Sequence, residues 1–377
     1  MKIVADSKIP FLKGVLEPFA EVIYASGNEI SAAMVKDADA LIVRTRTKCN
    51  ASLLEGSKVK FIATATIGFD HIDADFCASK GIEWTNAPGC NSGSVMQYIA
   101  AVLAHLSNKY NFNYAEKTIG IVGVGNVGSK VARLASLLGM KVLLNDPPRE
   151  RKEGKGGFVS LKRIQEEADI ITFHVPLNKS GTDKTHYLFN EGFLGKLKAA
   201  SIIINSSRGE VVSNAYLKQA LKENKIKAAV LDVWENEPEI DIELLRLVDI
   251  ATPHIAGYSA DGKAMGTAMS VQALSRFFNL NLNNWFPENI PLPKDKNINI
   301  NAEGLTAQEV INKAILVTYN ITTDDETLRN SIRTFENQRS DYPIRREFNA
   351  FKINLINDDN HNLKILNQLG FGLNQLF

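Results

Sequence analysis

Short apolar runs alternate with helically spaced segments over the first third of the chain. The runs cover residues 2–6, 21–25, 40–44 and 60–66, and the helically spaced segments include 30–37 and 49–56. Apolar runs of this length predict buried strands. Because strands that alternate with helices form a parallel sheet covered on both faces, this part of the chain predicts an α/β domain.

The alternation returns after residue 92 with a stronger signal. A helix that is apolar on most faces is predicted over 95–106. Strands are predicted over 117–123, 140–146, 168–176, 200–208, 227–233 and 249–256, with a helix over 128–138 after the first of them. These strands end in polar residues, and ligand sites in open parallel sheets lie at such carboxyl ends. We therefore expect a second α/β domain that carries a ligand site.

The composition changes after residue 278. Residues 279–301 contain many Asn residues and three prolines, which predicts an irregular linker. Helices over 306–320 and 324–339 and a strand over 351–357 follow, so the tail predicts a third domain of roughly 90 residues, which is small for independent burial of a core. We therefore expect the tail to dock on another chain; packing on its own subunit is the alternative.

Charge and cysteine content disfavour several classes of function. The 377 residues include 43 Lys and Arg against 42 Asp and Glu, so no global basic field is available to hold nucleic acid. The three cysteines, Cys49, Cys77 and Cys90, form no C-x-x-C pair. A disulfide scaffold and a structural zinc site are therefore disfavoured, we expect no metal, and a reducing compartment is the simple interpretation.

Membrane association is also disfavoured by the pattern. Asp6 and Lys8 interrupt the N-terminal segment before a signal-peptide core can form. The richest apolar run, residues 98–106, is about half the ~20 residues that span a bilayer. We expect a soluble, cytoplasmic protein.

A glycine-rich turn follows the first strand of the second domain. Gly123, Gly125 and Gly128 have G-x-G-x-x-G spacing and lie between a predicted strand and a predicted helix, the context that gives this motif meaning. Gly123 permits the tight turn, Gly125 lets the backbone approach a pyrophosphate, and Gly128 lets the helix pack closely on the strand. The helix N-terminus, with Asn126 and Val127, presents N–H groups to the anion. A glycine turn without a ligand is the alternative.

An acidic residue completes this signature. Asp146 lies 18 residues beyond Gly128, at the end of the next predicted strand. A carboxylate there accepts hydrogen bonds from the adenosine ribose and repels a ribose phosphate, so NAD is favoured over NADP as the cofactor. Arg149 nearby weakens that preference.

Three charged residues follow the late strands: Arg208 in SSRG, Glu237 in DVWENEP and His254 in TPHIAG. Because strand ends converge at one crevice, these residues can meet there. Oxidation of a 2-hydroxy acid needs a base for the hydroxyl proton, and His254 suits that role. Glu237 would orient the imidazole, and Arg208 would bind the substrate carboxylate. Each residue also has a structural interpretation as a turn or loop residue.

Other polar residues near these strand ends receive lesser roles. Asp232 is positioned to hydrogen-bond the nicotinamide side, with turn capping as the alternative. His174 is expected to line the cofactor pocket as a wall. His71 is expected to pack or to form a hydrogen bond.

The turns GVGNVG, SSRG, ENEP and PHIAG resemble those of the D-2-hydroxyacid dehydrogenase family, over most of residues 1–280. The resemblance implies an α/β fold with two lobes. A flavodoxin-like substrate-binding domain would cover 1–92 plus 258–280, and a Rossmann domain for NAD would cover 93–257. The tail, 286–377, would be a small α+β domain for homodimerisation.

A narrower resemblance within this family rests on two further stretches. They are TIGFDHID with WTNAPGCNSGSV, and the tail segment TLRNSIRTFENQRSDYPIRREF. Both resemble the members that oxidise 4-phospho-D-erythronate to (R)-3-hydroxy-2-oxo-4-phosphooxybutanoate with NAD, in the synthesis of pyridoxal 5′-phosphate. The substrate would then be a phosphorylated small-molecule 2-hydroxy acid.

The resemblance also implies individual contacts. Substrate contacts map onto Thr45, Thr66 and Tyr258. Cofactor contacts map onto Asp146, Val175, Ser206, Ser207, Arg208, Asp232 and Gly257, with a backbone contact only at Val175. Arg44 and Arg46 flank Thr45 and predict a clamp for phosphate or carboxylate, with a solvated basic turn as the alternative. Arg345 and Arg346 would reach a neighbour's active site or only its surface.

Two other functions remain open at this point. Oxidation of 3-phosphoglycerate or another 2-hydroxy acid would use the same fold and the same three residues. An NAD-sensing binding protein without turnover would keep the fold as well, because function resides in the site and not in the fold.

Overall fold

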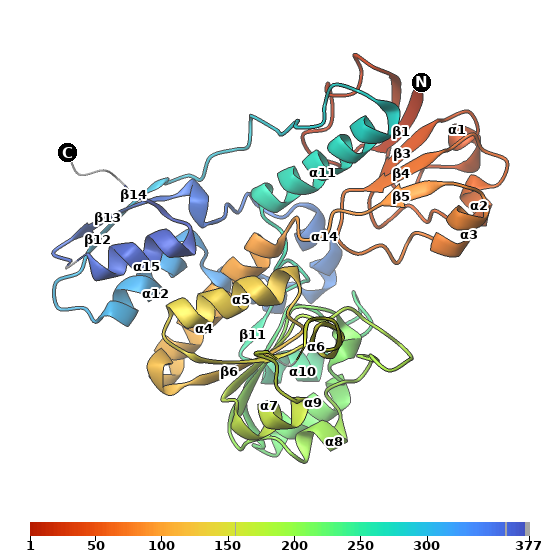
Figure 1. The fold of residues 1–377 in the computed structure, drawn as a ribbon. Coiled ribbons are helices and arrows are strands. Elements are labelled where there is room, and N and C mark those ends of the chain that lie inside the picture. Colours follow the sequence, from red (N-terminus) through yellow and green to blue (C-terminus); the bar gives the residue numbers. More distant parts are fainter. Residues whose placement is uncertain (155, 359, 374–377) are drawn as a thin grey trace. The chain divides into compact units, whose positions relative to one another are not determined.

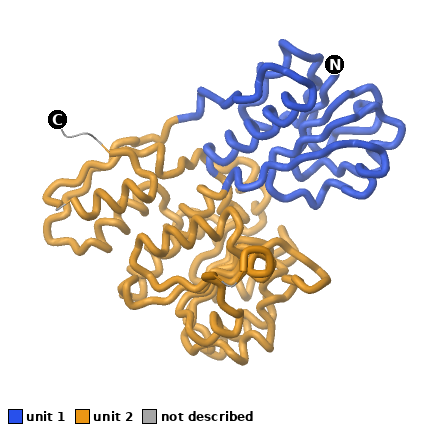
Figure 2. The backbone as a smooth tube through the Cα atoms, viewed as in Figure 1, with its two compact units in different colours: residues 1–91, 259–291 blue, residues 92–258, 292–377 orange. Residues whose placement is uncertain are grey.

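The computed structural model describes residues 1–154, 156–358 and 360–373, which divide into two compact units (Figures 1 and 2). Unit 1 contains residues 1–91 and 259–291, and unit 2 contains residues 92–258 and 292–377. The chain thus passes from one unit to the other near residues 91, 258 and 291. None of the helices in the described ranges has the length and apolarity that crossing a bilayer requires.

Unit 1 is built on a parallel sheet with the strand order β2-β1-β3-β4-β5. This is the flavodoxin-like order. The strands are β1 (Lys2–Asp6), β2 (Glu21–Ala25), β3 (Ala40–Val43), β4 (Phe61–Thr64) and β5 (Glu83–Thr85). The central strands β3 and β4 are buried along their whole length, as expected when helices cover both faces.

Each face of this sheet has its own hydrophobic cluster. The helices α1 (Ala32–Val35), α2 (Ala51–Leu54) and α3 (Ala74–Ser79) cover one face. The long helix α11 (Ala260–Phe278) covers the other, where Phe277 stacks on Phe61 with ring centres 4.8 Å apart. The returning segment expected after residue 258 is therefore a helix that completes the core of unit 1.

Unit 2 contains a six-stranded parallel sheet with the order β11-β10-β9-β8-β6-β7. The strands are β6 (Thr118–Val122), β7 (Lys141–Asn145), β8 (Ile170–Phe173), β9 (Ser201–Asn205), β10 (Ile226–Leu231) and β11 (Ile250–Ala251). The chain builds outward from β6 in both directions. The carboxyl end of β6 is therefore the topological switch point, where such sheets bind ligands.

Helices cover both faces of this sheet. One face packs on α4 (Ser92–Tyr110) and α5 (Asn126–Leu137). The other packs on α7 (Leu161–Glu167), α8 (Glu191–Leu194), α9 (Asn214–Lys222) and α10 (Ile242–Leu247). Helix α6 (Pro147–Glu153) follows β7, and short 3₁₀ turns lie at η1 (Tyr114–Glu116) and η2 (Gly209–Val211).

The tail adds a small parallel sheet, β12 (Asn297–Asn301), β13 (Lys352–Ile356) and β14 (Gly372–Leu373), in the order β12-β13-β14. Its helices are α12 (Ala307–Thr318), α13 (Ile321–Asn330), α14 (Phe335–Ser340) and α15 (His361–Leu369), and 3₁₀ turns lie at η3 (Ile332–Thr334) and η4 (Phe348–Ala350). The last four residues, 374–377, lie outside the described residues.

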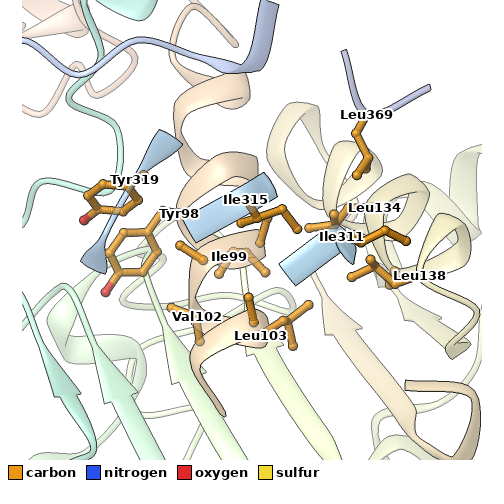
Figure 3. Close-up of a cluster of buried hydrophobic side chains, with 14 of the residues drawn as sticks. Tyr98, Ile99, Val102, Leu103, Leu134, Leu138, Ile311, Ile315, Tyr319 and Leu369 are labelled. Atoms are coloured by element: carbon orange, nitrogen blue, oxygen red, sulfur yellow. The ribbon is translucent and has the colours of Figure 1, made fainter. Parts of the chain in front are cut away.

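The tail shares a hydrophobic core with the Rossmann helices of its own chain (Figure 3). Ile311, Ile315 and Tyr319 from the α12 region pack in one cluster with side chains of α4 and α5. Leu369 of α15 joins the same cluster. Packing on its own subunit, which was the alternative to docking on another chain, therefore supplies the apolar surface that so small a domain cannot bury alone.

Two element predictions for the tail were wrong. The end of the expected linker is strand β12, because Ile298 and Ile300 alternate with Asn and bury their side chains on one face. The single helix expected over 324–339 is interrupted at Ser331, whose backbone leaves the helical region. Ser331 and Thr334 form local hydrogen bonds there, which compete with helix continuation.

Candidate active site

The glycine-rich turn connects β6 to α5. Gly123 has φ +88°, and a Cβ there would lie 2.6 Å from the carbonyl oxygen of His174, which follows β8. A Cβ on Gly128 would lie 2.0 Å from the carbonyl oxygen of Gly123. Side chains at these two positions would force the turn away from the strand ends, so both glycines are needed for close packing.

Gly125 is needed for a different reason. A Cβ there would meet no atom within 4 Å among the described residues. Helix α5 begins at the next residue, Asn126, and no side chain in the described chain caps this helix end. Open space in front of unused N–H groups fits the pyrophosphate of a dinucleotide.

Gly125→Ala is therefore expected to weaken cofactor binding without changing the stability of the fold. Its φ of −76° suits alanine, so the urea midpoint of unfolding should stay within error of the wild type. The added methyl group would occupy the space predicted for the pyrophosphate and raise the Kd for NAD at least about tenfold. Fluorescence titration with NAD measures this change, and an unchanged Kd would contradict the assigned role of the turn.

Asp146 forms a hydrogen bond with the backbone of the same turn. Its carboxylate accepts from the backbone N–H of Val124 at 2.8 Å and caps α6 by accepting from Arg149 N at 3.0 Å. The Arg149 guanidinium binds Glu153 and the carbonyl oxygen of Val124. The structure thus joins the acidic residue to the glycine-rich turn, and it pairs Arg149 with a carboxylate, which reduces its availability for a ribose phosphate.

The residues after β9 form a second polar turn. Asn205 accepts from Ser207 through both the backbone N–H, at 3.1 Å, and the hydroxyl, at 2.8 Å, and it donates to the carbonyl oxygen of Arg208 at 2.9 Å. These three bonds hold the SSR segment in one conformation. The Oγ of Ser206 is buried and has no hydrogen-bond partner among the described residues. An orphaned buried hydroxyl of this kind fits a contact to a bound cofactor.

Gly209 brings this turn against the turn after β10. A Cβ on Gly209 would lie 1.9 Å from the carbonyl oxygen of Trp234. Only glycine permits such an approach of two backbones. Arg208 is thereby placed next to the segment that carries Glu237.

Glu237 and His254 meet directly. The Nδ1 atom of His254 lies 2.8 Å from Oε2 of Glu237, and Oε1 of Glu237 accepts from the backbone N–H of Trp234 at 2.9 Å. Burial raises the pKa of Glu237, but the hydrogen bond and charge of His254 and the N–H of Trp234 outweigh burial and hold it below its usual value. An ionised Glu237 therefore accepts from Nδ1–H, and Nε2 of His254 is left as the basic nitrogen.

His254 is presented by a strained turn that Asp232 holds in place. The φ of His254 is +57°, in the left-handed region. Asp232 is 1% exposed, and its carboxylate accepts from Thr252 Oγ1 at 2.7 Å, Ile255 N at 2.7 Å and Ala256 N at 3.0 Å. Both lone pairs of Oδ1 are used in this way, so only Oδ2 could accept from the nicotinamide side. Burial raises the pKa of Asp232, although these hydrogen bonds act to lower it.

The tail contacts the same turn through Arg345. Arg345 is 5% exposed, and its Nη2 donates to the carbonyl oxygen of Ala256 at 2.5 Å. Its guanidinium lies 4.5 Å from the ring centre of Tyr319. Within this chain, Arg345 therefore contacts the segment between His254 and the candidate substrate residue Tyr258.

The remaining cofactor candidates lie around the glycine-rich turn and the His254 turn. Val175 Cγ1 would lie 2.7 Å from a Cβ on Gly123, so this side chain borders the turn. His174 bonds Thr172 Oγ1 through Nε2, and burial lowers its pKa to about 3. A neutral imidazole fits the expected wall rather than an acid or base. Gly257 directly follows Ala256.

The substrate candidates of the first domain lie in unit 1, at the carboxyl ends of two paired strands. Thr45 and Arg46 are exposed and Arg44 is half-buried, all just after β3. Thr66 follows β4 and bonds Thr64 Oγ1 at 2.7 Å, and Thr64 also bonds His71. These residues therefore share one edge of the sheet of unit 1.

Sequence reasoning missed the positioning residues of the site. Asn205 had a usable signal, because Asn at the end of an apolar run is a typical turn residue. Gly209 also follows Arg208 directly in the SSRG motif. No local signal marks Arg345, because its contact with Ala256 joins positions 89 residues apart.

Comparisons with known proteins agree with this geometry. Residues 98–256 match the family described as D-isomer specific 2-hydroxyacid dehydrogenase, NAD binding domain, and residues 291–370 match a domain of unknown function, DUF3410. A D-lactate dehydrogenase from Aquifex aeolicus, solved with NAD and lactic acid, superposes with a TM-score of 0.61 at 27% identity, over 74% of this chain and 96% of that chain. D-2-hydroxyisocaproate dehydrogenase shares the fold with a TM-score of 0.62 at 22% identity, over 74% and 97%.

Curated relatives match over nearly the whole chain. The erythronate-4-phosphate dehydrogenases of Bacteroides fragilis strain YCH46 and Bacteroides thetaiotaomicron are 51% and 52% identical over 94% of this chain and 99% of their own length. That of Proteus mirabilis is 40% identical over 98% of this chain and 99% of its own. The resemblance seen in the sequence is thereby confirmed, and the chain belongs to the erythronate-4-phosphate dehydrogenases, within the D-isomer specific 2-hydroxyacid dehydrogenase family.

Proposed function

We propose that the chain oxidises 4-phospho-D-erythronate at C2 with NAD, giving (R)-3-hydroxy-2-oxo-4-phosphooxybutanoate for pyridoxal 5′-phosphate synthesis. The observation that carries the proposal is the 2.8 Å contact between His254 Nδ1 and Glu237, because it prepares a base at the carboxyl end of the sheet that also carries the dinucleotide turn. The names of the relatives support the choice of substrate, since they are 51% identical over 94% of this chain.

His254 acts as the base. Its Nε2 takes the proton of the C2 hydroxyl, and the imidazolium that forms is stabilised by Glu237, which already accepts from Nδ1. The bond from Trp234 N keeps the carboxylate of Glu237 in place during this step. A base that is oriented before the substrate arrives does not lose entropy during the reaction.

Arg208 binds the substrate carboxylate. Its guanidinium offers a planar fork of donors that matches the two carboxylate oxygens, and this pairing orients C2 toward His254. The bond from Arg208 Nη1 to the carbonyl oxygen of Ser207 restricts the rotamers of this side chain. The turn that Asn205 and Gly209 shape therefore holds this guanidinium in place for the carboxylate, which substrate and product both carry.

The residues present fit NAD. Gly123, Gly125, Asn126, Val127 and Gly128 would hold the pyrophosphate, Asp146 the adenosine ribose, and Val175, Ser206, Ser207, Arg208, Asp232 and Gly257 the remainder. When bound, NAD supplies the acceptor for the hydride that leaves C2. The substrate side would be completed by Arg44, Thr45, Arg46, Thr66 and Tyr258.

The test is a comparison of NAD reduction on three acids. We expect kcat/KM for 4-phospho-D-erythronate to exceed that for D-erythronate by about 100-fold or more, because D-erythronate lacks the phosphate that the site pairs with positive charge. It should also exceed that for 3-phosphoglycerate, which keeps the phosphate on a shorter carbon chain. A 2-oxo acid is added in parallel, with product analysis, in case reduced cofactor stays bound. Preference for 3-phosphoglycerate would replace the proposed substrate, and NAD binding without any turnover would favour a sensor.

We also propose that the chain acts as a cytoplasmic homodimer that associates through its tail. Large apolar side chains remain exposed there, including Val317 at 57%, Ile344 at 62% and Ile356 at 49%. Exposed apolar surface of this kind is typical of an interface. Light scattering after size exclusion measures the oligomeric state, and a monomer at micromolar concentration would exclude the dimer.

A further inference from the structure

The tail places an arginine against Tyr258, four residues after His254. Arg339 belongs to α14 and lies 81 residues after Tyr258, yet its Nη2 is 3.4 Å from the Tyr258 hydroxyl. Its Cζ lies 6.0 Å from the ring centres of both Tyr258 and Phe335. Arg339 is therefore held against the segment that follows the His254 turn, within the same compact unit.

The donors of Arg339 are only partly used. Nη1 donates to Glu336 at 2.9 Å, and the two side chains are 22% and 36% exposed, respectively. Nε is buried and has no acceptor among the described residues. Because native proteins rarely leave a buried N–H without an acceptor, this guanidinium is suited to an acceptor that comes from outside the chain.

The positive charge of Arg339 acts on the carboxylate of Glu237. It is one of the influences that lower the pKa of Glu237, after burial, which acts in the opposite direction, and after the contacts with His254 and Trp234. Burial would lower the pKa of Arg339 itself, but its hydrogen bond with Tyr258 and the charges of Glu336 and Glu237 raise it. Arg339 therefore stays protonated beside Tyr258.

On the basis of the proposed function, we propose that Arg339 binds the phosphate of the substrate in the active site of its own chain and determines the preference for a phosphorylated acid. The substrate has two anionic ends, and Arg208 serves the carboxylate next to the reacting carbon. A phosphate dianion has three oxygens, and the planar fork of an arginine can donate to two of them. Arg339 contacts Tyr258 and has an unused Nε donor, and these two observations carry the proposal.

The experiment compares Arg339→Met and Arg339→Lys with the wild type on two substrates, 4-phospho-D-erythronate and D-erythronate, at saturating NAD. Arg339→Met is expected to lose about 100-fold in kcat/KM on the phosphorylated acid, mainly through KM, and less than about threefold on D-erythronate. Arg339→Lys should lose an intermediate factor, because it keeps the charge and loses the fork. Competition by inorganic phosphate gives a second readout, and its Ki should rise in both variants.

Arg333→Met is the matched control, since Arg333 is an exposed arginine of the same tail. Its kcat/KM should equal that of the wild type on both substrates. Equal losses on both substrates would assign Arg339 to holding Tyr258 or Glu237 and would overturn the inference, as would no loss at all. Should Arg339→Met fail to fold by circular dichroism, Arg339→Lys and the phosphate Ki carry the test. Absence of turnover of 4-phospho-D-erythronate by the wild type would overturn the proposed function instead.

Discussion

Replacing His254 with Ala is expected to reduce kcat by about 10²- to 10⁴-fold, the range that general bases contribute. The substitution removes the nitrogen that takes the hydroxyl proton and leaves Glu237 without its partner at 2.8 Å. The glycine-rich turn is untouched, so NAD should bind with its wild-type Kd. Stopped-flow measurement of NADH formation, together with a fluorescence titration of NAD, tests both statements.

His186→Ala serves as the control for this variant. His186 packs against Tyr187 with ring centres 4.0 Å apart and has no place in the proposed site. Its kcat should equal that of the wild type. If His254→Ala retained more than a tenth of wild-type turnover, another group would have to be the base, and the role of Glu237 would need a different explanation.

Gly209→Ala should have the largest effect on stability among single glycine changes. The added Cβ would lie 1.9 Å from the carbonyl oxygen of Trp234, and two backbones must separate to make room. We expect a loss of about 3 kcal/mol or more in the free energy of unfolding, at the upper end for overpacked sites. Activity should fall further than stability explains, because the displaced turns carry Arg208 and Glu237.

Gly192→Ala is the matched comparison in the same unit. It lies in helix α8, is exposed, and its Cβ would approach nothing nearer than Asn190 Oδ1 at 3.4 Å. Alanine is the better helix former, so stability should be equal or slightly higher. Urea unfolding of both variants measures these effects. Similar midpoints for the two would show that the close approach of the Gly209 and Trp234 backbones does not require glycine.

Local patterns were sufficient for most of the fold. Strands β1, β2 and β13 form where apolar runs of matching length occur, because short apolar runs between polar turns favour strands. The failures have local causes too. Strand β12 was obscured by its asparagines, which are rare in strands, although Ile298 and Ile300 already alternated with period two.

For the candidate catalytic residues, the sequence indicated the residue types but not their contacts. Arg208, Glu237 and His254 stood out because the ends of parallel strands converge at one crevice and because these residue types suit the oxidation of a 2-hydroxy acid. Which nitrogen of His254 meets Glu237, and the bonds from Asp232 that hold the His254 turn, depend on atoms far apart along the chain. The contacts of Arg339 with Tyr258 and of Arg345 with Ala256 could not be predicted either, because no residue near either arginine in the sequence indicates them.

By itself the sequence determined two α/β domains, a dinucleotide turn, the residue types of a 2-hydroxy acid site, and the family. Spacing and hydrophobic period encode these features, and both are local properties of the chain. Only the tertiary structure decided that the tail packs on α4 and α5 of its own chain, that Gly209 must be small, and that Arg339 lies beside Tyr258. Those contacts depend on how distant surfaces fit together, and close packing is a property of the folded chain that no short segment carries.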